Sequence, residues 1–208
     1  MSNFKNIINH IKTVLTHKYW VGYYCFKAGL YWRGLTHDLS KFSPTEFLES
    51  IKYYTGTHSP IDEAKKVKGY SDAWLHHRGR NTHHYEYYLE FSEAKQEMIP
   101  YRMPYEDCVE MLCDFLGAAR AYLKEDFSFN KESKWWYEKE KNVIMDLHTK
   151  EFISIALASM SVMNDDSYLD GLGKDEIIKK YYYGDSFMCY TYHLHLRKEA
   201  KIYAKFKD

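Results

Sequence analysis

Apolar residues recur every three or four positions along most of this chain, and no stretch alternates regularly between apolar and polar side chains. The first such stretch predicts a helix from about Phe4 to Phe26. Its apolar positions are Ile7, Ile11, Val14, Val21 and Cys25. Because a β-strand has a side-chain period of two, this spacing favours an all-α fold over one with a substantial sheet.

The same spacing predicts more helices, separated by breaks that contain Gly or Pro. One helix runs from about Ile61 toward His77, and another covers about Tyr105 to Lys124. The remaining helical segments are Lys150–Met163, Lys174–Tyr182 and Asp185–Phe206, with a turn at Asn164-Asp165-Asp166. We therefore expect a single helical domain over residues 1–160, with a helical C-terminal extension over residues 161–208 packed on it.

The charge balance limits the partners of the protein. Lys and Arg match Asp and Glu at 29 each, so no net field draws the chain to nucleic acid or to an anionic membrane, although a local basic patch stays open. The N-terminus lacks a basic-then-apolar signal pattern, and no apolar run is long enough to span a bilayer. We therefore expect a soluble, cytoplasmic protein.

Cysteine and tyrosine usage adds two expectations. The four cysteines show no paired short spacing of the kind that binds zinc, so we expect reduced, buried thiols. They are Cys25, Cys108, Cys113 and Cys189. The 21 Tyr residues suit core margins and pocket walls, with a base-stacking surface as the alternative.

An adjacent His and Asp stand just before a helix start. Ser43 is the predicted N-cap of that helix, Pro44 fits its first position, and Glu46 completes a capping box. Neighbouring residues on a helix point about 100° apart, so His37 and Asp38 share no helix face. Both side chains can still reach one metal ion beside the helix end, and a fixed break between helices would hold them rigidly.

Further imidazoles are grouped along the chain. The sequence has 11 His, among them the pairs His76-His77 and His83-His84. A single His is usually a surface or hydrogen-bonded residue, but several of them together with Asp38 favour a metal site. Mixed imidazole and carboxylate ligands suit Mn, Fe, Co, Ni or Zn better than Mg.

Asp114 lies on a helix face that predicts burial. Glu110 and Asp114 are four residues apart and share that face. The face continues through the small residues Gly117, Ala118 and Ala121. Small residues allow a neighbouring helix to come close, and a buried carboxylate must be paired or bound to a metal. Two interpretations stay open, a metal ligand or a salt bridge to Arg33, Arg78, Arg102 or Arg120.

The order of these residues resembles the HD superfamily of metal-dependent phosphohydrolases. In that family an early helix supplies a His, a second one the His-Asp pair and a late one an Asp, as His17, His37-Asp38 and Asp114 do here. The local pattern is similar to the HD-GYP branch, where a Lys and then a Pro follow the pair, as Lys41 and Pro44 do. His83-His84-Tyr85-Glu86 approximates the double His followed by Glu of that branch. The Gly-Tyr-Pro signature is absent from the sequence, so cyclic-dinucleotide cleavage is not implied.

More narrowly, the chain resembles an uncharacterised family of small microbial and viral proteins. The shared pattern is His-Asp-Leu-Ser-Lys-Phe-Ser-Pro at 37–44, then His77-x-x-x-Asn81-x-His83-His84, then Glu110-Met111-Leu112-Cys113-Asp114. This resemblance covers about Ile7 to Ala158, and the rest of the chain has no counterpart.

These resemblances imply an HD-like helical bundle that holds one or two divalent ions. One ion would be held by His17, His37, Asp38 and Asp114. His77 and either His83 or His84 would complete a second site, with Asp38 bridging the two. Asn81 and Glu86 would orient the imidazoles.

The resemblances also imply roles in catalysis. Lys41 would contact the substrate phosphate with help from Arg78 or Arg80, although Arg80 is better explained as a solvated surface charge. Asp38 or Glu110 would act as the base. A bound metal lowers the pKa of water and neutralises charge on phosphoryl oxygens.

The implied function is hydrolysis of a nucleotide or a related small phosphate ester by metal-activated water. Two alternatives stay open: a non-catalytic metal- or nucleotide-binding protein on the same scaffold, and an HD-like di-iron oxygenase. The tail from Asp166 onward offers a homodimer surface, a lid or simple packing. His193 and His195 are two residues apart on a predicted helix and face away from each other, so we expect neither to be a ligand.

Overall fold

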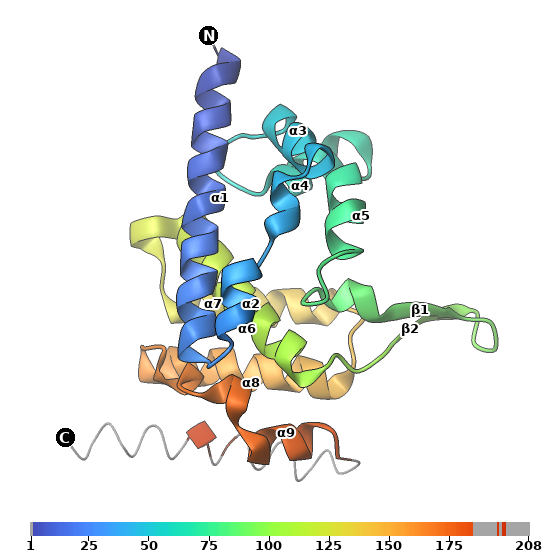
Figure 1. Cartoon of the computed structure of the whole chain (residues 1–208). Helices are drawn as coiled ribbons and strands as arrows, with labels where there is room; N and C mark the ends of the chain where they lie inside the picture. The colour runs from blue at the N-terminus through green and yellow to red at the C-terminus, as the bar shows by residue number, and fades with distance from the viewer. Residues whose placement is uncertain (1, 185–194, 196, 199–208) are drawn as a thin grey trace.

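Two long helices lie side by side through the body of the molecule (Figure 1). The computed structural model describes residues 2–184, 195, 197 and 198. In it, α1 (Ser2–Lys27) packs along α6 (Tyr105–Leu123). A Cβ atom on Gly117 would lie 2.3 Å from Cγ2 of Val21 and 2.9 Å from its backbone nitrogen. The small-residue face predicted on α6 therefore lets α1 come close, and it carries Asp114 one turn before Gly117.

The chain leaves α1 through a tight turn and reaches the His-Asp pair. Gly29 ends α1 with a φ of +80°, which favours glycine, and α2 (Tyr31–Thr36) follows. The 3₁₀ helix η1 (Leu39–Phe42) then leads into α3 (Pro44–Lys52). The predicted pair thus lies between two short helices that fix its position.

The helix start predicted at Ser43 is confirmed, but half of the capping box is wrong. Ser43 Oγ accepts a hydrogen bond from the Glu46 backbone N–H at 3.4 Å, with Pro44 in the first turn. The backbone N–H of Ser43 donates to the Ser40 carbonyl instead of to Glu46. The Glu46 carboxylate instead accepts hydrogen bonds from the side chains of His76 and His77.

The single helix predicted from Ile61 toward His77 is wrong, because two helices occupy this stretch. They are α4 (Pro60–Lys68) and α5 (Asp72–Arg78). Gly69 has a φ of +82° and ends α4, and Ser71 Oγ accepts from the Trp74 N–H at 3.0 Å to start α5. The break aims α5 so that its last residues face α3.

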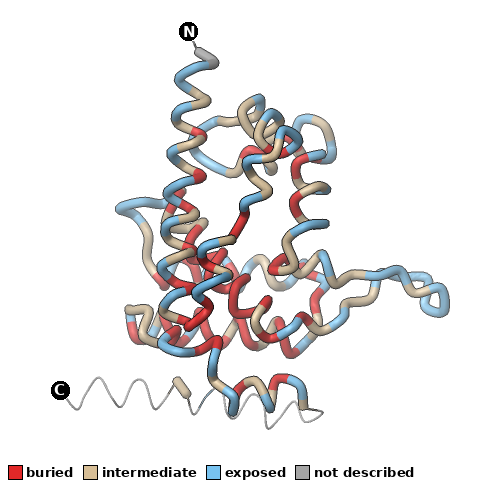
Figure 2. The backbone as a smooth tube through the Cα atoms, viewed as in Figure 1, coloured by how far each residue is buried: buried red, intermediate tan, exposed pale blue. Residues whose placement is uncertain are grey.

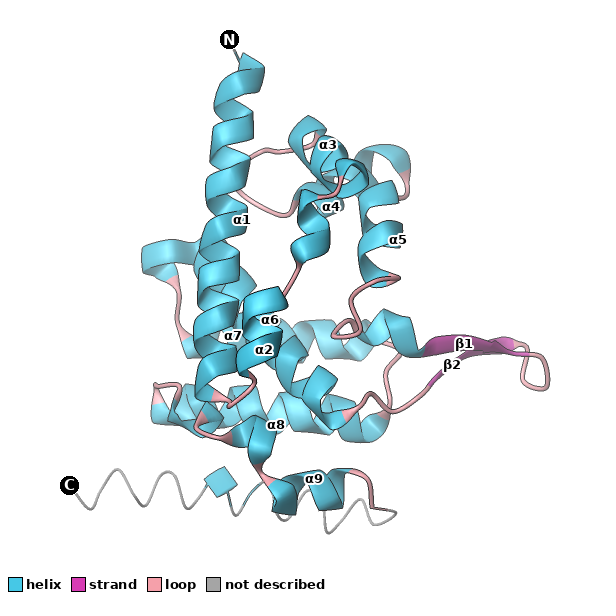
Figure 3. Ribbon diagram, viewed as in Figure 1, coloured by secondary structure: helices cyan, strands magenta, loops and turns pink. Residues whose placement is uncertain are grey.

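A small hairpin follows α5. After the 3₁₀ helix η2 (Tyr85–Tyr88), β1 (Leu89–Ser92) pairs antiparallel with β2 (Glu97–Pro100), with Leu89 opposite Pro100. It projects from the helical body in Figure 3. All other regular elements in the described part of the chain are helical, which confirms the all-α fold class.

The remaining α-helices pack around and below the lower half of the α1–α6 pair, where buried residues gather (Figure 2). They are α7 (Phe129–Lys139), which the sequence analysis did not predict, α8 (Leu147–Met163) and α9 (Glu176–Tyr182). The Tyr182 hydroxyl donates to the Met103 carbonyl at 3.0 Å, and the Tyr105 hydroxyl to the Leu172 carbonyl at 2.7 Å. Tyrosines with a dry ring and a bonded hydroxyl thus join the C-terminal helices to α6.

Three expectations concern thiols, the tail and membranes. Cys25, Cys108 and Cys113 are buried and unpaired thiols, whereas Cys189 lies outside the described residues. The helix expected over Asp185–Phe206 lies almost wholly outside them too. Among the helices that the structure describes, none is both long and apolar enough to cross a bilayer.

Candidate metal centre

Seven side chains from five segments converge in one buried region. Each of them is less than nine per cent exposed. They are His17 on α1, His37 and Asp38 after α2, His77 on α5, His83 and His84 before η2, and Asp114 on α6. Their ligand atoms form two groups, and within each group all atoms lie within 4.8 Å of one another.

The first group consists of His17, His37, Asp38 and Asp114. Asp38 Oδ2 lies 3.3 Å from Nε2 of both His17 and His37. Asp114 Oδ1 lies 3.1 Å from His17 Nε2 and 3.3 Å from His37 Nε2. Two carboxylates and two imidazoles therefore face one point.

The second group consists of Asp38, His77, His83 and His84. The other oxygen of Asp38, Oδ1, lies 3.3 Å from His77 Nε2 and 3.4 Å from His83 Nε2. Asp38 thus belongs to both groups, with one oxygen turned to each. Both His83 and His84 take part, where the sequence analysis expected only one of them.

The backbone explains how adjacent residues serve one centre. Helix α2 ends at Thr36, and Asp38 adopts the left-handed conformation with φ 56° and ψ 30°. The pair is therefore not helical, and the 100° separation expected of helix neighbours does not apply. A left-handed Asp is uncommon and marks a position where the fold holds the side chain in place.

Carboxylates stand behind three of the imidazoles. His37 Nδ1 lies 2.9 Å from Glu110 Oε1, and His83 Nδ1 lies 3.4 Å from the same oxygen. His77 Nδ1 lies 2.7 Å from Glu46 Oε2. A carboxylate that accepts from Nδ1 fixes the tautomer and leaves Nε2 as the acceptor, which is how proteins orient metal-binding histidines.

This arrangement fits a divalent cation. Once Nδ1 donates to a carboxylate, the Nε2 lone pairs of His77 and His83 point at the acceptor Asp38 Oδ1. Two acceptors can face each other in a buried place only with a proton or a cation between them. Asp38 Oδ1, His83 Nε2 and His84 Nε2 are indeed buried without a hydrogen-bond partner. The buried groups could therefore hold a metal ion.

The pKa values reflect the same electrostatics. Burial and the nearby His37 lower the pKa of His83, but the carboxylates of Asp38 and Glu110 outweigh them and raise it to about 9. Burial raises the pKa of Asp114, yet hydrogen bonds from His17 and His37 hold it well below its usual range. Without an ion, protons on the imidazoles supply the positive charge that these carboxylates attract.

Glu110 is anchored from its other side by Arg33. Arg33 Nη1 lies 2.8 Å from Glu110 Oε2 and also donates to Asp107. Asp107 in turn accepts from Thr82 Oγ1 at 3.0 Å and from the Tyr88 hydroxyl. Both oxygens of Glu110 are thus engaged, which fits a positioning role better than the role of a base.

Glu46 is the supporting residue that sequence reasoning missed. Its carboxylate accepts from His76 Nδ1 at 2.6 Å and from His77 Nδ1 at 2.7 Å. No spacing signal links position 46 to positions 76 and 77, because only the folding of α5 against α3 brings them together. Asn81 lies where it was expected, with Nδ2 2.8 Å from both Ser40 Oγ and the His77 carbonyl.

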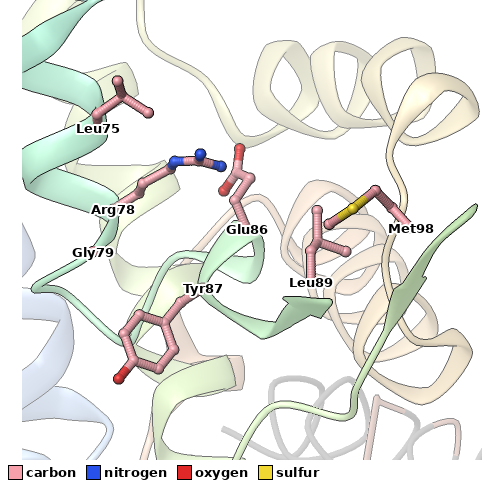
Figure 4. Close-up of a pocket in the computed structure, with 7 residues that line it drawn as sticks. All are labelled: Leu75, Arg78, Gly79, Glu86, Tyr87, Leu89 and Met98. Atoms are coloured by element: carbon pink, nitrogen blue, oxygen red, sulfur yellow. The ribbon is translucent and has the colours of Figure 1, made fainter. Parts of the chain in front are cut away.

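The residues expected to contact the substrate lie in two separate places. Lys41 Nζ lies 2.5 Å from Asp38 Oδ2, and its side chain stays 25% exposed. Arg78 and Glu86 instead line a surface pocket of about 380 Å³ (Figure 4). The other lining residues are Leu75, Gly79, Tyr87, Leu89 and Met98. Glu86 therefore stands on a pocket wall with Arg78, not behind an imidazole as expected.

Asp114 pairs with histidines, and not with the arginines that were the alternative interpretation. Asp114 contacts His17 and His37, whereas Arg33 pairs with Asp107 and Glu110. Arg102 lies 3.4 Å from Asp146, and Arg120 donates to the Tyr24 hydroxyl at 3.0 Å. Arg80 and His195 are exposed, and His193 lies outside the described residues.

The comparisons with known proteins give one match. A family model described as a family of unknown function (DUF5662) matches residues 6–159. No curated protein and no solved structure matches the chain. The matched range contains both ligand groups and ends inside α8.

Proposed function

The chain belongs to the DUF5662 family, and we propose that it is a metal-dependent phosphohydrolase acting on a nucleotide or a related small phosphate ester. One observation carries the proposal: two buried ligand groups share the carboxylate of Asp38. Two-metal sites of this kind suit phosphoryl transfer, because both the attacking and the leaving oxygen need stabilisation. The order of the ligand residues, with its resemblance to the HD superfamily, points the same way.

The donor set supports a transition metal. Imidazole nitrogens and carboxylate oxygens together favour Mn, Fe, Co, Ni or Zn over Mg. His17, His37, Asp38 and Asp114 would hold one ion, and Asp38, His77, His83 and His84 the other. When bound, such ions lower the pKa of water and neutralise charge on phosphoryl oxygens.

The cation beside Asp38 supports a phosphate substrate. Burial lowers the pKa of Lys41, but the charges of Asp38 and Asp114 raise it above its usual value. Lys41 therefore stays an ammonium at neutral pH, and its partly exposed side chain can bind a phosphoryl oxygen. Glu110 is engaged with His37 and Arg33, and both oxygens of Asp38 face ligand groups, so the geometry favours positioning roles for these two carboxylates.

Metal analysis and a substrate panel test the proposal. Purified protein should contain transition metal and hydrolyse at least one of a set of mono-, tri- and cyclic nucleotides. Asp38→Ala should abolish both properties, whereas Asp62→Ala, at an exposed position on α4, should change neither. Activity that survives Asp38→Ala, or a wild type without metal, would overturn the mechanism. Oxygen consumption with a substrate lacking phosphate would favour a di-iron oxygenase, and metal without turnover a binding protein.

A further inference from the structure

A surface pocket between the end of α5 and the hairpin takes no part in the candidate metal centre. It is lined by the C-terminal end of α5, by η2 and by both strands of the hairpin. Its volume of about 380 Å³ lies within the range of about 300–1,000 Å³ that is typical of small-molecule sites. None of its lining residues belongs to either ligand group, so the pocket is available to a separate ligand.

Two opposite charges face this pocket without pairing. Arg78 ends α5 and Glu86 lies on η2, and Figure 4 shows the guanidinium and the carboxylate turned toward one another. Within the described part of the chain, neither side chain forms an ion pair. Oxygen Oε2 of Glu86 is also buried without a hydrogen-bond partner. A buried carboxylate oxygen without a partner costs stability, so this atom is suited to a hydrogen-bond donor from a ligand.

Apolar side chains form another part of the pocket wall. Leu75 on α5 is 51% exposed, and Met98 on β2 is 42% exposed. Leu89 on β1 pairs with Pro100, and Met98 lies two residues before Pro100 on the same strand. Leu89 and Met98 therefore lie on one face of the hairpin, because strand side chains two residues apart point the same way. An apolar group of a ligand would cover these surfaces, and their burial would favour binding.

We propose that this pocket binds a free α-amino acid with an apolar side chain. The Arg78 guanidinium donates two parallel hydrogen bonds to the α-carboxylate, and Glu86 accepts from the α-ammonium. The apolar side chain lies against Leu75, Leu89 and Met98. An anion such as phosphate would meet the charge of Glu86, and a simple cation would meet that of Arg78, whereas a zwitterion pairs with both. The site is independent of the proposed hydrolysis, because it shares no residue with the ligand groups.

Titration of the full-length protein with L-leucine and two analogues tests the proposal. The analogues are 3-methylbutylamine, which is leucine without its carboxylate, and 4-methylpentanoate, which is leucine without its ammonium group. Calorimetry should show that each binds at least about tenfold more weakly than L-leucine, because each loses the charged hydrogen bonds to one side of the pocket. L-alanine should also bind more weakly, since its methyl group leaves the apolar wall uncovered. No saturable binding of L-leucine, or equal affinity for either analogue, would contradict the proposal.

Two single variants locate the site. Arg78→Gln should weaken leucine binding about tenfold and remove the preference over 3-methylbutylamine. Glu86→Gln should weaken leucine binding by a similar factor and remove the preference over 4-methylpentanoate. Arg80→Gln and Glu90→Gln, at exposed positions nearby in the sequence, are the matched controls and should change binding less than about twofold. Amino acids also coordinate transition metals, so leucine binding that neither Arg78→Gln nor Glu86→Gln weakens would place the ligand outside the pocket and refute the inference.

Discussion

The two ligand groups that share Asp38 are built in different ways. The first takes His17 and Asp114 from α1 and α6, the two long helices of the core, and its carboxylates contact its imidazoles at 3.1–3.3 Å. The second takes His77, His83 and His84 from a short helix and the loop after it, and three of its atoms are buried without a hydrogen-bond partner. Core packing therefore fixes the first group. The second is held by hydrogen-bonding contacts: His77 donates to Glu46, Asn81 donates to the His77 carbonyl, and His83 Nδ1 faces Glu110.

Removing the shared carboxylate should have the largest effect, because neither group is complete without it. Asp38→Asn keeps the shape of the side chain and tolerates the left-handed backbone at φ 56°, but removes the charge. We expect the loss of all bound metal, measured as ions per chain by mass spectrometry, with an unchanged circular dichroism spectrum. Asp62→Asn is the control. Retention of one ion per chain by Asp38→Asn would mean that one group binds without the shared oxygen.

Two single variants should separate the groups. His17→Gln removes a ligand from the first group only, and His84→Gln removes one from the second only. Each should reduce the metal content from two ions per chain to one. If either variant loses both ions, the two groups act as a single centre and the comparison between them fails.

The supporting carboxylates should have smaller and unequal effects. Glu46 contacts His77 alone among the ligands, whereas Glu110 contacts His37 in one group and His83 in the other. Glu46→Gln should weaken the second ion by about 10–100-fold and leave the first unchanged, whereas Glu110→Gln should weaken both. Calorimetric metal titration measures the two affinities. The same pattern in both variants would contradict the assignment of Glu46 to one group.

The smallest effect concerns the pH dependence of stability. The pKa of His83 rises from 6.5 to about 9 in the metal-free fold. Protonation of His83 therefore makes its full contribution to the free energy of unfolding below pH 6.5, and this contribution is lost as the pH rises through about 9. We expect the metal-free protein to lose stability over that range, seen as a steady fall in Tm as the pH rises. Thermal unfolding from pH 6.5 to 9.5 measures it, and His83→Gln should flatten the profile.

The sequence predicted the elements whose pattern is local. The spacing of apolar residues predicted α1 and α6 to within two residues at each end, and Ser43 marked the start of α3. The small residues at Gly117 and beyond predicted the close approach of another helix, without identifying α1. Helix α7 escaped prediction because its buried residues include Glu132 as well as Phe129 and Trp136, so its apolar stripe is interrupted.

The candidate centre was predictable as a set of residue types but not as a geometry. His17 entered through the resemblance to a family, whereas the small-residue face predicted that Asp114 is buried without identifying what it contacts. Glu46 and Arg33 act through contacts between distant segments, which no local pattern encodes. The break at Gly69 was missed because a single glycine is compatible with a continuing helix.

The absence of a side chain at Gly117 sets the distance between α1 and α6, and thereby the spacing of the first ligand group. His17 lies one turn before Val21 on α1, and Asp114 lies nearly one turn before Gly117 on α6. The contact between Val21 and Gly117 therefore sets the distance between His17 and Asp114. A methyl group 2.3 Å from Val21 Cγ2 would force the helices apart by about 1 Å. Metal–ligand distances tolerate only about 0.2 Å. A glycine outside both ligand groups thus sets the spacing that an ion at the first group would require.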